Sequence, residues 1–294
     1  MTADTDRLVS FLLPGRDVRG RLLRLGAVLD EVLAAHPYGE TAARLLAEAL
    51  TLVALVGAIL KPDEGQVTLQ AQPAQGRHGP VRLLVADHAG GALRGYIELD
   101  PDLRLPADGD LAALFGQGRL VITIDQATTA RRYQGVVPLE GRSLAETAES
   151  YFRQSEQIPT LVRLAASRDP DGRWRSGGIL LQHLPRGEEG GARLHAAETA
   201  PNWAHVEALA RTLTDGELLD AALPLEQLLG RLFAEDEVRL FSPVALTRGC
   251  RCSEDYIRAV LMRFPAAERA AMRDADGVIW VDCRFCSRRF RFDL

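Results

Sequence analysis

The four cysteines of this chain are the residues whose type and spacing point most directly to chemistry. They form two close pairs, Cys250 with Cys252 and Cys283 with Cys286, and thirty residues separate the pairs. Two such pairs suit a tetrahedral four-thiolate zinc site, because each turn supplies two thiolates and the insert folds between them. We therefore expect one zinc ion per chain, bound by all four cysteines.

The first pair is unusual, because one residue separates its cysteines where ordinary zinc ribbons have two. If each pair oxidised within itself, two short crosslinks would replace one metal crosslink across the insert, and the module would lose zinc and unfold. The neighbouring Arg251 and other nearby arginines also favour thiolate character. The spacing alone leaves two roles open, a redox-sensitive centre and an inert structural zinc, of which the inert one is the commoner.

The residues around the cysteines predict a small module that depends on its metal. Ser253 can cap a helix that runs to about Arg263, and Pro265 can begin another. Residues 278–282 and 289–292 have the pattern of a hairpin. About 45 residues are too few for an independent core. Zinc would therefore supply folding free energy, on the order of 10–16 kcal/mol in comparable modules.

The longer part of the chain must position this module, and its pattern predicts an α+β fold. With 294 residues and 47% hydrophobic content, the chain is long enough for one large domain and a small one. Strands occur in runs and helices are grouped, which favours α+β layers over a doubly wound sheet. We expect strands at residues 9–13, 18–25, 66–72, 80–87, 92–99, 119–126, 133–138, 160–167 and 178–184, and helices at residues 27–36, 40–60 and 144–154.

The pattern changes after residue 185, which divides the chain into three parts. We expect an N-terminal α+β core at residues 1–190, a helical linker at 191–236 and the four-cysteine zinc domain at 237–294. The linker has helical faces interrupted at Gly216 and Pro224, with Asn202 and Asp215 as expected helix caps. Short helices need a surface to pack on. The linker is therefore either a solvated connection with a docked face or a detachable element that covers apolar surface.

Composition excludes several classes of function. The net charge is −5 and the basic residues are scattered, which gives no support for nucleic-acid binding. Lys61 is the only lysine and no glycine-rich loop precedes it, so a P-loop is absent and a Schiff-base lysine is not expected. The longest apolar stretch is too short to cross a bilayer. Because the first 249 residues contain no cysteine, we expect a reducing cytoplasm rather than a secreted disulfide scaffold.

Several segments, in order, resemble the redox-regulated 33 kDa heat-shock chaperone family (heat shock protein 33). They include Asp-Val-Arg-Gly-Arg at residues 17–21, Gly-Pro-Val-Arg-Leu-Leu-Val at 79–85, Ser-Glu-Gln-Ile-Pro-Thr at 155–160 and Gly-Gly-Ile-Leu-Leu-Gln at 177–182. The C-x-C and C-x-x-C pairs complete the series. The resemblance covers nearly the whole chain, and the hexapeptide followed by the cysteine spacing is its most specific part.

The resemblance implies an ATP-independent holdase rather than an enzyme. In the reduced form such a protein binds zinc and is inactive, and oxidation releases zinc and exposes surface for unfolding client proteins. Carried over to this chain, Cys250, Cys252, Cys283 and Cys286 are zinc ligands and redox-active thiols, with disulfides Cys250 to Cys252 and Cys283 to Cys286. The family is also associated with homodimers. This chain has Glu254 and Asp255 after Ser253, where many relatives have a Glu-Arg pair, but that departure touches no ligand.

Two other classes of function remain as alternatives. A zinc-ribbon nucleic-acid module is favoured only by the arginines of the tail, and a salt-dependent shift of labelled RNA or DNA would support it. A thiol oxidoreductase built on Cys283 and Cys286 would need the C-x-x-C at a helix start early in a βαβ unit. Here that motif lies in a hairpin pattern at the end of the chain. Turnover in insulin reduction would separate an oxidoreductase from a stoichiometric holdase.

Overall fold

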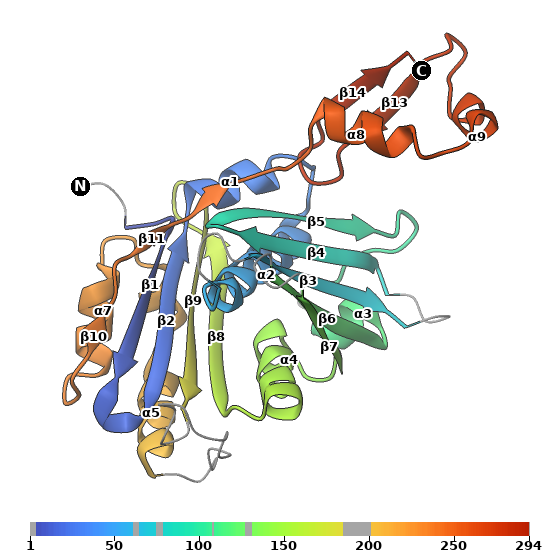
Figure 1. Cartoon of the computed structure of the whole chain (residues 1–294). Coiled ribbons are helices and arrows are strands. Elements are labelled where there is room, and N and C mark those ends of the chain that lie inside the picture. The colour runs from blue at the N-terminus through green and yellow to red at the C-terminus, as the bar shows by residue number, and fades with distance from the viewer. Residues whose placement is uncertain are drawn as a thin grey trace.

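A computed structural model describes residues 4–60, 65–74, 79–107, 109–126, 131–184 and 201–293. Lys61 and the expected boundary between residues 190 and 191 lie outside these ranges. The described chain contains two large sheets with a long helix between them and further helices on the outer side of one sheet (Figure 1). A small C-terminal module projects away from both sheets. The α+β class predicted from the sequence is confirmed.

The first half of the chain contains antiparallel strands, short helices and the long helix α2. Its elements are β1 (Arg7–Leu13), η1 (Pro14–Arg16), β2 (Val18–Leu25), α1 (Ala27–Leu33), α2 (Glu40–Gly57), β3 (Gly65–Pro73), β4 (Val81–Ala89), β5 (Ala92–Leu99), α3 (Leu111–Phe115), β6 (Gly118–Gln126) and β7 (Arg131–Pro138). The second half contains α4 (Leu144–Tyr151), the π-helical turn η2 (Phe152–Glu156), β8 (Thr160–Arg168), β9 (Trp174–His183), α5 (Pro201–Thr212), α6 (Asp215–Leu219), α7 (Leu225–Leu232), β10 (Arg239–Leu240), β11 (Val244–Ala245), β12 (Thr247–Arg248), α8 (Glu254–Leu261), α9 (Ala266–Ala271), β13 (Ile279–Asp282) and β14 (Arg289–Phe292).

Helix α2 forms the centre of the molecule. Fourteen of its eighteen residues are buried, so it is apolar on nearly all sides, as expected for a helix enclosed between two layers. One layer is the sheet β10-β1-β2-β9-β8, which we call sheet A, and the other is β12-β5-β4-β3-β6-β7, called sheet B. Both sheets are antiparallel except where β12 joins β5. Among the helices of the described residues, none is long and apolar enough to cross a membrane.

Sheet A is buried on both faces, because α2 covers one face and helices α5 to α7 cover the other. Successive side chains of each strand point to opposite faces. In β1, Leu8 packs toward α2, whereas Val9 and Phe11 point outward to the linker helices α5 to α7. Gly20 of β2 lies opposite Phe11, and any side chain there would meet the Phe11 ring at 2.1 Å. The glycine therefore makes room for the ring, which packs against Phe233 with centroids 5.9 Å apart.

Residues 239–248 connect the linker to the cysteine module by running along the edges of both sheets. Strands β10 and β11 pair with β1, and β12 pairs with β5. Nearly all side chains of these three strands are exposed. Backbone hydrogen bonds hold this segment, with Leu246 as its buried side chain. These short strands have no alternating apolar pattern, which explains why the sequence did not predict them.

Most expected elements are present within a few residues of their predicted bounds, and the differences have local causes. Helix α3 was not expected, although Asp110 caps it and Gly116 ends it at a positive φ. The cap of α6 is Thr214 rather than Asp215, because the Thr214 side chain and Glu217 form a reciprocal capping box. Asn202 is likewise not a cap, since it is the second residue of α5.

Candidate metal and redox centre

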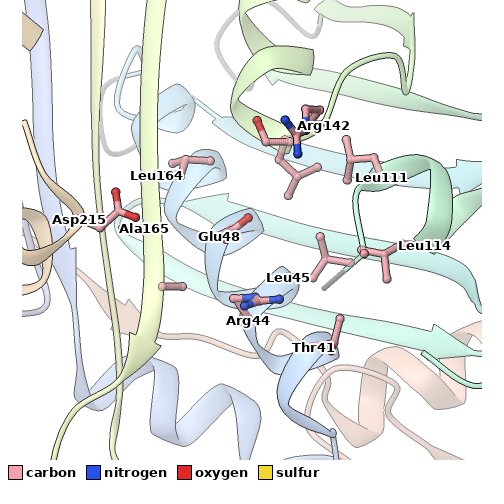
Figure 2. A pocket seen from close by; sticks show the side chains of 14 residues that line it. Thr41, Arg44, Leu45, Glu48, Leu111, Leu114, Arg142, Leu164, Ala165 and Asp215 are labelled. Carbon is pink, nitrogen blue, oxygen red and sulfur yellow. The ribbon is translucent and has the colours of Figure 1, made fainter. Parts of the chain in front are cut away.

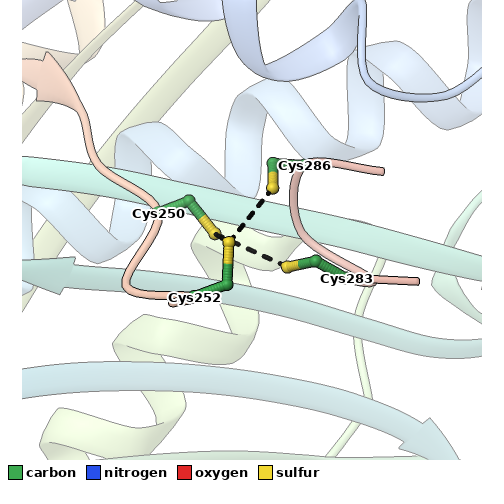
Figure 3. A group of neighbouring side chains, drawn as sticks. All are labelled: Cys250, Cys252, Cys283 and Cys286. Carbon is green, nitrogen blue, oxygen red and sulfur yellow. Dashed lines mark hydrogen bonds between the residues drawn. The ribbon is translucent and has the colours of Figure 1, made fainter. Parts of the chain in front are cut away.

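The four cysteines come from two loops that the fold brings together. Cys250 and Cys252 lie between β12 and α8, and Cys283 and Cys286 lie in the turn between β13 and β14. Figure 3 shows the four side chains pointing toward a common centre. All are half-buried and carry free thiols. Among the described residues, these four form the one group of His, Cys, Asp or Glu side chains arranged to hold a metal ion.

The distances between the sulfur atoms fit tetrahedral coordination. The Sγ atoms of Cys250 and Cys252 are 3.3 Å apart, those of Cys250 and Cys283 3.6 Å, and those of Cys252 and Cys286 3.5 Å. All four lie within 4.8 Å of one another. A zinc ion with Zn–S bonds of about 2.3 Å requires sulfur separations of roughly 3.8 Å at tetrahedral angles. The set therefore needs only small shifts of the sulfur atoms to hold such an ion.

The surroundings of the thiols shift their pKa values in different directions. Burial by itself raises the pKa of Cys250, but hydrogen bonds from the Cys252 backbone and from the neighbouring thiols outweigh it and lower the pKa to about 7. Burial and the neighbouring thiols raise the pKa of Cys252. Burial also raises the pKa of Cys283, although the backbone N–H groups of Phe285 and Cys286 point at its sulfur and favour the thiolate. Such N–H to sulfur bonds suit a site that binds thiolates.

The module around the cysteines has a very small core of its own. Its buried apolar side chains are Leu261, Ile279, Phe290 and Phe292, with two of the cysteines packed beside them. Helix α9 buries no residue at all. The expected N-cap at Ser253 is present, because its hydroxyl accepts a hydrogen bond from the Tyr256 amide. The predicted hairpin is also present as β13 and β14. A core of this size fits a module that depends on its four thiols for stability.

The residues between the cysteines contact the N-terminal core, and sequence reasoning missed this. The guanidinium of Arg251 pairs with Asp87 of β4 rather than with the thiols. The ring of Phe285 stands edge-on to Tyr96 and under the guanidinium of Arg94, both in β5. One signal was available in the sequence, because Asp87 and Arg94 are charged residues within apolar strand patterns. Nothing local in the sequence indicates their partners.

The linker helices cover the outer face of sheet A. Trp203, Val206, Leu228 and Phe233 are each at most 4% exposed and pack on apolar side chains of β1, β2, β8 and β9. Arg24 of β2 is fully buried and donates hydrogen bonds to three linker carbonyls. Their oxygens belong to Glu217, Leu218 and Leu223. The linker is therefore docked through an apolar surface and one buried cation.

A cavity of about 330 Å³ lies between α2, α3, α4 and β8, and Asp215 of α6 also lines it. Figure 2 shows Glu48 of α2 at this cavity, together with Arg44, Arg142 and the linker residue Asp215. Burial raises the pKa of Glu48 to about 7, with Asp215 adding to the shift and Arg44 opposing it. Ionisation of Glu48 therefore disfavours the folded state at this cavity.

The Ser-Glu-Gln-Ile-Pro-Thr block forms a turn between a helix and a strand. Its first residues close the π-helical turn η2, Gln157 has a left-handed backbone with φ 57°, and β8 begins at Thr160. The Tyr151 hydroxyl donates to Glu156 at 2.9 Å. The block thus directs the chain into sheet A.

Comparisons with known proteins agree with this architecture. The family model described as Hsp33 protein matches residues 6–293. The 33 kDa chaperonin of Caulobacter vibrioides (strain NA1000 / CB15N) is 44% identical over 297 residues, which cover 98% of this chain and 95% of that protein. The 33 kDa chaperonin of Azotobacter vinelandii is 40% identical over 294 residues, covering 99% of this chain and 93% of that protein.

A solved structure shows the same fold. The crystal structure of the 33 kDa chaperonin (heat shock protein 33 homolog) from Thermotoga maritima matches with a TM-score of 0.80 at 24% identity, covering 98% of this chain and 94% of that one. The resemblance stated from the sequence motifs is confirmed by the family match over nearly the whole chain. This chain belongs to the Hsp33 chaperone family.

Proposed function

We propose that this protein is a redox-regulated, ATP-independent holdase that binds unfolding client proteins after its four cysteines are oxidised. The observation that carries the proposal is the connection between the cysteine cluster and a covered apolar surface. The module joins residues 239–248, these join the linker, and the linker covers the outer face of sheet A. Loss of order in the module can therefore propagate to the linker helices that cover sheet A.

Zinc is the ion that the donor set fits. Four thiolates at near-tetrahedral separations are typical of structural zinc sites, and the N–H groups directed at Cys283 stabilise such ligands. Cys250, Cys252, Cys283 and Cys286 would hold one ion per chain. When bound, zinc would supply the crosslink between two loops that the small module core cannot hold together alone.

Oxidation would replace that crosslink by two local ones. With peroxide as the oxidant, each pair of thiols loses two electrons and two protons, one peroxide molecule is reduced to two waters, and one S–S bond forms. We propose pairing within each motif, Cys250 with Cys252 and Cys283 with Cys286. This pairing is the one that the family resemblance implies. The sulfurs of Cys250 and Cys252 are 3.3 Å apart, and each also lies close to a sulfur of the other loop, at 3.6 and 3.5 Å. Disulfides do not ligate zinc as thiolates do, so the ion would leave and the module would unfold.

The client surface would then be the apolar face beneath the linker. Linker helices α5, α6 and α7 are short, and helices of this length depend on packing for stability. Once they detach, apolar residues of sheet A become a contiguous exposed patch of the kind that binds other proteins. We further propose that the oxidised form acts as a homodimer in the cytoplasm, and light scattering of reduced and peroxide-treated protein measures that change in mass.

The decisive experiment measures client aggregation without nucleotide. Peroxide-treated protein should suppress the aggregation of a thermally unfolding client in proportion to its concentration, and the reduced protein should do so poorly. Returning the treated protein to reductant and zinc should restore the inactive form. Equal suppression by the reduced and oxidised forms would contradict the redox gate, and no suppression by either would contradict the holdase itself.

A further inference from the structure

We propose that the N-terminal core regulates the metal centre through a docking patch on β4 and β5 that recognises the residues between the paired cysteines. The patch consists of Asp87, Arg94 and Tyr96, and we call it the dock. Its occupants are Arg251, from between Cys250 and Cys252, and Phe285, from between Cys283 and Cys286. This inference rests on the proposed zinc site, and it adds a control of metal affinity that lies outside the cysteine module.

The first contact is a buried acid that needs a cation. The side chain of Asp87 is only 3% exposed, and its Oδ2 atom pairs with Arg251 at 2.5 Å and with Arg94 at 2.6 Å. Its other oxygen accepts a hydrogen bond from Thr68 at 2.6 Å. Arg251 also donates to Gln66 of β3. A buried carboxylate distinguishes partners by charge and geometry much better than an exposed one does.

The second contact is aromatic and uses the same arginine. The Phe285 ring lies 4.0 Å from the guanidinium carbon of Arg94 and 5.0 Å from the Tyr96 ring, which it meets at 87°. Arg94 thus lies between Asp87 and Phe285 and links the two halves of the dock. The neighbouring backbone adds to the contact, because the carbonyl of Arg284 is 2.7 Å from the imidazole of His36.

Both halves of the dock are occupied while the two cysteine loops converge on one cluster. Arg251 is flanked by two converging thiols, and Phe285 lies in a turn whose amides point at Cys283. The first loop starts directly from sheet B, since the Gly249 amide donates to the Leu93 carbonyl at 2.9 Å. The two occupants are more than thirty residues apart in sequence, so their joint placement depends on the centre that joins their loops.

Coupling of this kind is reciprocal. If metal binding sets the loop geometry that the dock recognises, docking must raise the metal affinity by the same factor. Two linked contacts also reinforce each other, because each holds the other at high local concentration. The core would therefore protect the thiols from metal loss and from reagents, and weakening the dock would make the centre more sensitive without changing any ligand.

A double-mutant cycle on the full-length reduced protein tests this. The variants are Asp87→Asn, Arg251→Gln and the pair together. Asp100→Asn is the control, because it breaks an ion pair outside the dock, between Asp100, which directly follows β5, and Arg82 of β4. Zinc affinity is measured by competition with a chromogenic chelator, and thiol exposure by the rate of alkylation. Each single variant should lose zinc at roughly tenfold lower chelator concentration, within the range usual for coupled sites.

The pair should be no more than about twofold worse than Asp87→Asn alone, because Arg251 acts through Asp87 and residues that act through one contact are non-additive. Tyr96→Leu serves as an independent variant if Asp87→Asn fails to fold, and it should lower zinc affinity in the same direction. Additive losses of zinc affinity in the cycle would overturn the inference, and so would a zinc affinity in both dock variants equal to that of Asp100→Asn. Neither result would contradict the zinc site itself. Unsubstituted protein that binds no zinc would instead contradict the proposed function.

Discussion

Replacing Arg24 by methionine should release the linker without oxidation. The guanidinium is fully buried, and it donates to the carbonyls of Leu218 at 2.8 Å, Leu223 at 2.9 Å and Glu217 at 3.1 Å. Methionine fills much of the same volume but offers no donor. While the linker stays docked, the three carbonyls would then be buried without the hydrogen bonds from Arg24. They can bond to water only when the linker opens.

The magnitude follows from the number of bonds and the cost of burying the charge. Hydrogen bonds from a charged donor contribute about 1.5–3 kcal/mol each, so three of them give about 4.5–9 kcal/mol. Desolvation of the cation, which also lowers the pKa of Arg24, offsets several kcal/mol of this. We expect the linker to lose about 3 kcal/mol of docking free energy, which raises its open population roughly a hundredfold.

Hydrogen exchange of the reduced, zinc-loaded protein measures this directly. Amides in residues 201–233 should exchange roughly a hundredfold faster in Arg24→Met when exchange follows local opening. Arg231→Met is the matched control, because it removes an exposed ion pair to Glu217 in the same segment and should change exchange little. Exchange in Arg24→Met no faster than in Arg231→Met would mean that the buried guanidinium does not hold the linker in place. Fast exchange with no anti-aggregation activity would place the client site elsewhere.

Three further outcomes can be checked. A Cβ at Gly177 would lie 2.4 Å from the Leu218 carbonyl, so Gly177→Ala should loosen the linker in hydrogen exchange, whereas Gly230→Ala meets nothing within 4 Å and should not. Burial raises the pKa of Glu48 from 4.5 to about 7. The contribution of Glu48 to the free energy of unfolding is therefore fully present below pH 4.5 and is lost as the pH rises through 7. Glu48→Gln should therefore gain on the order of 2 kcal/mol over the unsubstituted protein in urea unfolding at pH 8, and nothing at pH 4. Cys250→Ser should weaken zinc binding, measured by chelator competition, by more than the roughly 100-fold loss that follows removal of a residue hydrogen-bonded to a metal ligand. Unchanged affinity would contradict the four-cysteine site.

Much of the fold could be predicted because its layers impose simple periodicities. The short apolar run over 177–181 suits the middle of β9, which is buried on both faces by α2 and the linker. The nearly uniform apolarity of α2 likewise suits a helix between two sheets. The predicted bounds differ from the observed ones mainly at the ends, where helices and strands stop for local reasons such as the left-handed residue Asp17.

The short edge strands β10, β11 and β12 could not be predicted. Each pairs through two residues, and their side chains remain exposed, so no alternation marks them. Their conformation is fixed by the free edges of β1 and β5, which lie far away in sequence. Propensity and pattern do not contain that information, because it arises only when the sheets are assembled.

The candidate site was predictable in its ligand types and not in its surroundings. Thiols at close spacing imply a cluster whatever the rest of the chain does, and the four sulfurs do come together. Arg251 looked like a cation that would activate thiols, but its partner Asp87 is 164 positions away. Only the tertiary structure shows that Arg251, which lies between Cys250 and Cys252, contacts the N-terminal core.

The most direct test of the redox gate measures zinc and free thiols together, before and after peroxide, on the same full-length sample used for the aggregation assay. We expect one zinc and four reactive thiols per denatured chain before treatment, and neither after it, with suppression of client aggregation rising as both are lost. Peroxide-treated protein that suppresses aggregation while it keeps its zinc and all four thiols would rule out the redox gate.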